Sequence, residues 1–175
     1  MIFTETPLKG AFLINIEPHR DDRGFFARTF CRQEFEKHGL NSNVMQCNIS
    51  WNAKAGTLRG MHFQAAPHSE AKLVRCSRGE IHDVIVDLRP ESATYRQHFA
   101  VKLSGENRQA LFIPEDFAHG FQTLMDDTEI EYQMSEFYVP GFGRGFRYDD
   151  PLFSIEWPLP DKIVSEQDLA WPPFK

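Results

Sequence analysis

Hydrophobic and polar positions form many short runs along the chain, and most of these runs have the character of β-strands. The runs are rich in β-branched and aromatic residues, and glycine, proline, asparagine or aspartate separates most of them. Their even spacing predicts a β-sandwich or a closed barrel and disfavours a sheet of βαβ units. The strands predicted in the middle of the chain cover residues 44–50, 56–64, 71–79, 80–88, 95–103, 109–115, 118–125 and 129–138.

The first forty residues predict two further strands and one helix. The strands cover residues 11–18 and 25–30, and the turn DDRG (21–24) lies between them. Residues 32–40 predict a short helix that ends at Gly39.

The last part of the chain, residues 139–175, predicts loops and one short helix near residues 165–169. This part is rich in proline, which interrupts helices and strands. Phe153, Ile155 and Trp157 make it too apolar for a loose tail. We therefore expect it to pack on the barrel.

Length and composition fit one globular domain over residues 1–175. The chain is 41% hydrophobic and 25% charged, which is ordinary for a folded protein. A net charge of −6 without a basic stripe argues against a nucleic-acid partner. No run approaches the roughly 18 apolar residues of a membrane helix. The three cysteines lack the spacing of a disulfide framework or a zinc site, which indicates free thiols. We therefore expect a cytoplasmic protein with neither a nucleic-acid nor a membrane partner.

Polar side chains occur on several predicted strands, although burying an unpaired charge in a barrel is costly. In TLRGMHFQ (57–64), strict alternation places Arg59 and His62 on opposite faces. A single histidine in a strand is as often structural as functional. Taken together, the polar side chains on these strands predict a pocket inside the barrel. They are Gln46, Asn48, Arg59, His62, Lys72, His119 and Tyr132.

A metal site is the first alternative for a histidine in such a barrel. Residues 111–121 resemble the second signature of cupin barrels, in which a proline-containing turn precedes a strand that carries a histidine. Metal-binding cupins have a His-x-His pair in their first signature, whereas His62 is followed here by Gln64. An amide is a poor ligand for a first-row metal. We therefore expect no metal and no other cofactor.

Without a metal, the candidate residues fit proton transfer at a carbon next to a carbonyl group. His62 is a candidate general base because imidazole titrates near neutral pH. Lys72 is a candidate to stabilise the resulting enolate, and Tyr132 is a candidate to return a proton from the opposite face. The alternatives are structural: a buried histidine, a solvated lysine and an aromatic side chain at a strand rim.

These residues belong to a longer pattern with which the chain resembles the dTDP-4-dehydrorhamnose 3,5-epimerase family. The resemblance implies an all-β, cupin-type jelly roll with a few short helices, and a homodimer that acts without a metal. It also implies a nucleotide-diphosphate-linked 4-keto-6-deoxyhexose as substrate, inverted at C3, at C5 or at both. The pattern consists, in order, of DDRGFF (21–26), QCNIS (46–50), GTLRGMHFQ (56–64), AKLVRC (71–76), DVIVDLRPES (83–92), IPEDFAHGF (113–121), EIEYQ (129–133), DDP (149–151) and SEQD (165–168).

The resemblance assigns a role to each matched residue. It implies that His62 is the base, that Asp168 orients it, and that Tyr132 is the acid. It further implies that arginines hold the diphosphate, that Tyr138 stacks on the nucleobase, and that several polar residues contact the sugar or its phosphates. The arginines are Arg23 and Arg59, and the polar residues are Gln46, Asn48, Lys72 and His119.

The chain departs from the family pattern mainly at the nucleotide end. Arg28 stands where a glutamate is typical, and we include it among the substrate-binding candidates because a guanidinium reverses the hydrogen-bonding role of a carboxylate. The nucleotide therefore stays open, with dTDP favoured over CDP and GDP. A non-catalytic sugar-nucleotide-binding cupin is the alternative. The other departures are Glu70 for a glutamine, Gly143 or Arg144 for a glutamate, Tyr148 for a tryptophan and Gln167 for a lysine.

Overall fold

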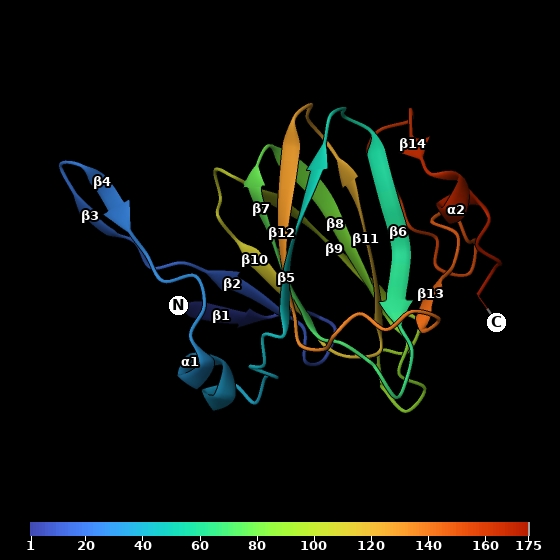
Figure 1. The fold of residues 1–175 in the computed structure, drawn as a ribbon, viewed down its shortest axis with the longest axis horizontal. Coiled ribbons are helices and arrows are strands. Elements are labelled where there is room, and N and C mark those ends of the chain that lie inside the picture. The colour runs from blue at the N-terminus through green and yellow to red at the C-terminus, as the bar shows by residue number, and fades with distance from the viewer. Residues whose placement is uncertain (175) are drawn as a thin grey trace.

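The computed structural model describes residues 1–174, and its main feature is a pair of β-sheets that face each other (Figure 1). The first sheet has six strands in the order β1-β2-β10-β7-β12-β5, and every neighbouring pair is antiparallel. These strands are β1 (Ile2–Glu5), β2 (Phe12–Asn15), β5 (Gln46–Asn52), β7 (Lys72–Arg78), β10 (Ala110–Ile113) and β12 (Thr128–Met134).

The second sheet has the order β13-β6-β11-β8-β9, and β14 pairs in parallel with β6. The predicted all-β sandwich is therefore confirmed, with sequence-distant strands such as β6 and β11 side by side. The strands of this sheet are β6 (Thr57–Gln64), β8 (Glu80–Asp87), β9 (His98–Ser104), β11 (Phe117–Thr123), β13 (Gly143–Gly145) and β14 (Ile163–Val164).

The core between the sheets follows from alternation along the strands. On β8, Ile81 and Ile85 point into it, and on β11, Phe117 and Phe121 do so. All four side chains are at most 2% exposed. Burying large apolar side chains stabilises each by roughly 1.5–3 kcal/mol, so this alternation fixes which face of each strand is internal.

The outer face of the second sheet lies under the C-terminal segment. Phe146 and Phe153 stack at a ring distance of 4.5 Å, and they pack with Met61 of β6 and Val84 of β8. The segment contains β13, β14 and the short helix α2 (Glu166–Leu169), which Figure 1 shows beside β6. This packing brings residues near the end of the chain to β6.

The helix α1 (Arg32–Lys37) covers part of the outer face of the first sheet. It ends in a Schellman motif: Gly39 has φ +69°, and the Leu40 amide donates to the Phe35 carbonyl at 3.0 Å. Phe35 and Leu40 are both buried there. The predicted helix end at Gly39 is confirmed. No helix among residues 1–174 has the length and hydropathy needed to cross a membrane.

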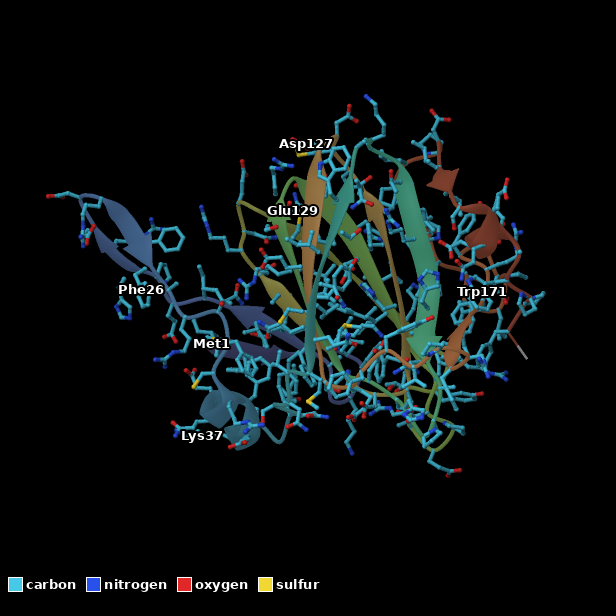
Figure 2. The ribbon with its side chains drawn as sticks, in the orientation of Figure 1. Met1, Phe26, Lys37, Asp127, Glu129 and Trp171 are labelled. Carbon is cyan, nitrogen blue, oxygen red and sulfur yellow. The ribbon has the colours of Figure 1, made fainter. Side chains whose placement is uncertain are left out.

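A two-stranded hairpin, β3 (His19–Asp21) and β4 (Gly24–Phe26), extends away from the sandwich (Figures 1 and 2). The sequence predicts a strand over 25–30, but the strand ends at Phe26 because its only partner, β3, ends the ladder there. The Phe26 side chain is 77% exposed at this position.

Candidate active site

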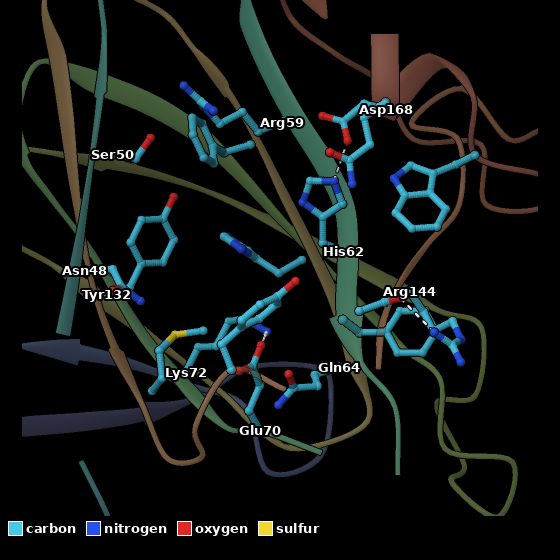
Figure 3. A pocket seen from close by; sticks show the side chains of 18 of the residues that line it. Asn48, Ser50, Arg59, His62, Gln64, Glu70, Lys72, Tyr132, Arg144 and Asp168 are labelled. Carbon is cyan, nitrogen blue, oxygen red and sulfur yellow. Dashed lines mark hydrogen bonds and ion pairs between the residues drawn. The ribbon is translucent and has the colours of Figure 1, made fainter. Parts of the chain in front are cut away.

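A cavity of about 630 Å³ lies between the two sheets, next to the C-terminal segment (Figure 3). Strands β5, β6, β7, β11 and β12 and helix α2 all contribute side chains to it. Eight of the predicted site residues line this cavity: Asn48, Arg59, His62, Lys72, His119, Tyr132, Tyr138 and Asp168.

A β-bulge in β6 places Arg59 and His62 on the same side of the strand. His62 pairs with His119 of β11, but Arg59 pairs with Phe121, so two residues of β6 lie opposite one residue of β11. A bulge of this kind shifts the side-chain alternation by one position. The strict alternation assumed from the sequence is therefore wrong here, and both side chains reach the cavity.

Glycines allow the two strands to approach at the bulge. Gly60 has φ +133°, and a Cβ on it would lie 2.6 Å from the Cα of Gly120. A Cβ on Gly120 would lie 2.7 Å from the Sδ of Met61. Met61 itself is fully buried under the C-terminal segment. Ordinary alternation then places Met61 and His62 on opposite faces, so that His62 faces the cavity and Met61 packs outward.

His62 and Asp168 form a hydrogen-bonded pair, with His62 Nε2 2.5 Å from Asp168 Oδ1. Asp168 is 4% exposed, and its amide donates to the Ser165 hydroxyl that caps α2. Burial alone would raise the pKa of Asp168, but the hydrogen bond and charge of His62 and the Gly60 amide outweigh it and lower the pKa. An ionised Asp168 accepts a hydrogen bond from the Nε2–H group of His62. The other ring nitrogen, Nδ1, is then free to take a proton.

Tyr132 lies across the cavity from His62 (Figure 3). Its ring meets the His119 ring edge-on, with the centroids 6.2 Å apart. Burial, and then the charge of Asp83, raise the pKa of the Tyr132 hydroxyl, although Arg59 and Ser50 act in the opposite direction. The hydroxyl is therefore protonated at neutral pH and has a proton to donate.

His119 belongs to a second buried pair. Its Nε2 lies 2.7 Å from Oδ1 of Asp83, and the side chains of both residues are at most 7% exposed. The other oxygen of Asp83 has no hydrogen-bond partner among the described residues. This pair fixes the His119 ring at the boundary between the core and the cavity.

Lys72 extends from the start of β7 and forms an ion pair with Glu70, with Nζ 2.7 Å from Oε1. Figure 3 shows this pair on the cavity wall below Tyr132. The Lys72 and Glu70 side chains are 8% and 10% exposed. The cavity therefore holds an ammonium group that a carboxylate balances.

The cavity thus combines an oriented imidazole, a protonated phenol on the facing wall and an ammonium group between them. Such a set can move protons on and off a carbon whose carbonyl oxygen is bound by the ammonium group. Among residues 1–174, no group of three or more His, Cys, Asp or Glu side chains is arranged to hold a metal ion. Gln64, at the metal-ligand position of other cupins, donates to the carbonyls of His68 at 2.7 Å and Phe137 at 2.9 Å.

Comparison with known proteins decides which chemistry this geometry serves. The family model for dTDP-4-dehydrorhamnose 3,5-epimerase matches residues 5–175. The chain belongs to the dTDP-4-dehydrorhamnose 3,5-epimerase family. A relative named dTDP-4-dehydrorhamnose 3,5-epimerase from Methanothermobacter thermautotrophicus is 45% identical over 99% of this chain and 94% of its own length.

Solved structures of the family have the same fold. The enzyme of this name from Elizabethkingia anophelis superposes with a TM-score of 0.97 at 37% identity, covering 99% of this chain and 96% of that one. The Bacillus anthracis enzyme, with TDP and pyrophosphate bound, has a TM-score of 0.95 at 37% identity and covers 99% of both chains. The predicted family, its cupin-type jelly roll and its isomerase class are confirmed.

Three residues predicted for the epimerase site do not line this cavity within the chain. Gln46 lies beside it and accepts a hydrogen bond from the Tyr138 amide at 2.6 Å. Arg23 is on the projecting hairpin, where its side chain is 90% exposed and pairs with Asp21. Arg28 pairs with Glu34 of α1 at 3.2 Å. The chain alone therefore supplies one of the two arginines predicted for the diphosphate.

Ser50 and Trp171 are among the cavity residues that are not predicted from the sequence. Ser50 lines the cavity next to Asn48, and period-two alternation along β5 is the signal that identifies it. Trp171 lies beyond the last matched motif, and its ring is 6.3 Å from that of His62. Figure 2 shows Trp171 beside β6, within the C-terminal segment. Only the packing of the C-terminal segment brings Trp171 to the site.

Proposed function

We propose that this epimerase acts on a dTDP-linked 4-keto-6-deoxyhexose and inverts C3, C5 or both by proton transfer through an enolate. The observation that carries the proposal is the His62–Asp168 pair facing the protonated Tyr132, with Lys72 between them. The bound TDP of the Bacillus anthracis relative supports dTDP as the nucleotide.

The first step removes a proton from the carbon next to the 4-keto group. Nδ1 of His62 takes the proton, and the electron pair of the C–H bond moves to the carbonyl oxygen to form an enolate. Asp168 stabilises the resulting imidazolium, because it lies 2.5 Å from Nε2. The Lys72 ammonium donates a hydrogen bond to the enolate oxygen.

The second step returns a proton to the opposite face of the same carbon. Tyr132 donates its hydroxyl proton, and the enolate electrons re-form the C–H bond and the carbonyl group. Water then protonates the phenolate and accepts the proton of the imidazolium, which restores both residues. Because base and acid stand on opposite walls, the carbon is inverted.

Other cavity residues hold the substrate. Arg59, whose Nε donates to Asn52 at 2.9 Å, binds the diphosphate. Asn48 and His119 contact the sugar or its phosphates. Tyr138 is 66% exposed at the rim, where its ring stacks on the nucleobase.

The hairpin supports a homodimer as the working form. Among residues 1–174 its two strands pair only with each other, and they carry the exposed Phe26 and Arg23 away from the sandwich. In a dimer it reaches the partner subunit, where Arg23 joins the diphosphate and Arg28 lies near the nucleotide. Cys31, Cys47 and Cys76 are all free thiols, which supports the reducing cytoplasm as the compartment.

The test is proton NMR in deuterated water with dTDP-, CDP- and GDP-linked 4-keto-6-deoxy sugars, following the C3 and C5 protons separately. We expect enzyme-dependent loss of these signals with the dTDP sugar, and His62→Ala to slow it by about 10²-fold or more. The same sugars without protein measure spontaneous exchange. If the wild-type protein binds a sugar nucleotide and exchanges no proton, a non-catalytic binding role replaces the proposal.

A further inference from the structure

Glu70 is the one acidic side chain that forms an ion pair with Lys72 among residues 1–174. It lies two positions before Lys72, and Figure 3 shows its carboxylate reaching toward the ammonium group from below. Both side chains line the cavity, and both are at least nine-tenths buried. The pair therefore stands inside the reaction chamber, where water screens charges weakly.

A buried ammonium group needs a counter-charge. Removing a lysine from water costs several kcal/mol unless an anion or hydrogen-bond acceptors replace the water. Glu70 supplies that charge at 2.7 Å. It also restricts the four-carbon side chain of Lys72, which otherwise samples many rotamers.

The pair leaves donors for the substrate. A lysine ammonium group has three N–H donors, and the carboxylate of Glu70 engages one side of it. Lys72 lines the cavity, so the remaining donors are available to the 4-keto oxygen in the proposed reaction. Glu70 therefore restricts the position of the ammonium group.

We propose that Glu70 is a positioning residue whose negative charge holds the Lys72 ammonium group in place, directed at the substrate's keto oxygen. A glutamine at this position would be neutral, so it differs from Glu70 by one full charge. An amide preserves the shape and one acceptor oxygen but supplies no counter-charge. This inference rests on the proposed function, because it gives Lys72 the task of holding the enolate oxygen.

The decisive comparison is between Glu70→Gln and Glu70→Asp. Glutamine keeps the size of the side chain and loses the charge, whereas aspartate keeps the charge on a side chain one methylene shorter. We expect kcat to fall about 10- to 100-fold in Glu70→Gln, the size expected when a hydrogen bond to a charged group is lost. We expect Glu70→Asp to stay within about threefold of wild type, and KM to change little in both.

A double-mutant cycle tests whether Glu70 acts through Lys72. In a Lys72→Met background, Glu70→Gln should change the residual exchange rate by less than about threefold, because the group it positions is gone. Glu131→Gln is the matched control, since Glu131 is exposed on β12 outside the cavity. Thermal unfolding of every variant separates loss of activity from loss of the fold.

The outcomes separate this inference from the proposed function. If wild-type protein exchanges no sugar proton, the proposed function itself fails. If wild type is active but Glu70→Gln retains as much kcat as Glu70→Asp, shape rather than charge matters and the inference is overturned. A further large loss from Glu70→Gln in the Lys72→Met background overturns it as well, because Glu70 then acts independently of Lys72.

Discussion

Replacing Tyr132 by phenylalanine removes one oxygen atom from the wall that faces His62. The ring still packs against His119 at 6.2 Å and against the core, so the change leaves the apolar contacts in place. Burial raises the pKa of Tyr132, so in the wild type the hydroxyl holds its proton throughout the neutral range. The variant therefore loses a proton donor and retains the His62–Asp168 pair.

The two half-reactions should respond differently to Tyr132→Phe. Proton removal depends on His62, and we expect its rate to fall by less than about tenfold. Inversion depends on the proton from the opposite face, and general acid catalysis contributes about 10²–10⁴-fold. We therefore expect solvent deuterium to enter the sugar at C3 or C5 while the new stereoisomer forms at least about 100 times more slowly than in the wild type.

The assay is proton NMR in deuterated water, which records signal loss and the new isomer in one experiment. Tyr95→Phe is the control, because Tyr95 lies outside the cavity, next to Arg96. Inversion by Tyr132→Phe within about threefold of wild type would refute the reasoning, because a difference that small leaves no room for general acid catalysis by this hydroxyl.

Two further substitutions test the structure around the site. Gly120→Ala should lower the free energy of unfolding by about 2 kcal/mol, because the new methyl group would clash with Met61 and the Arg59 carbonyl. Urea unfolding measures this change. Gly143→Ala is the control, because the space around Gly143 is open. Asp87→Asn should lower the free energy of unfolding by about 3 kcal/mol at pH 7, since the buried carboxylate accepts from Arg89. Burial alone would raise the pKa of Asp87, but hydrogen bonds, of which the one from Arg89 has the largest effect, lower the pKa to about 2. Because the pKa of Asp87 is lower in the folded state, its carboxylate stabilises the fold fully above the ordinary value of 3.8, and this contribution is lost as the pH falls through about 2. The difference in the free energy of unfolding between wild type and Asp87→Asn should therefore shrink over that range. A difference that does not depend on pH would contradict this reasoning.

The sequence predicts most strands well because alternation separates the side chains that face the core between the sheets from those that face outward. Alternation in EIHDVIVD, for example, places Ile81, Asp83 and Ile85 on one side of β8, and the structure has all three buried there. The end of α1 is also predictable from the local sequence, because the helix ends where Gly39 adopts a positive φ. The length of β4 is less predictable, since it depends on how far its partner strand continues.

The sequence predicts the site less well because two of its features are not local. The side of β6 that Arg59 faces depends on a bulge, and the bulge depends on how β6 and β11 pair. The position of Trp171 depends on the packing of a segment with little regular structure. For Asp168 only the family resemblance connects the residue to His62, because the two positions lie 106 residues apart.

The two faces of β6 connect the outer layer of the protein to its chemistry. Met61 packs outward with Phe146 and Phe153, and that cluster holds the C-terminal segment on the sheet. The same segment carries Asp168, which orients His62 on the inner face of the strand. Ordinary alternation separates Met61 from His62, and the bulge brings Arg59 to the inner face together with His62. Packing on the outside and the proposed proton transfer on the inside therefore depend on the same strand register.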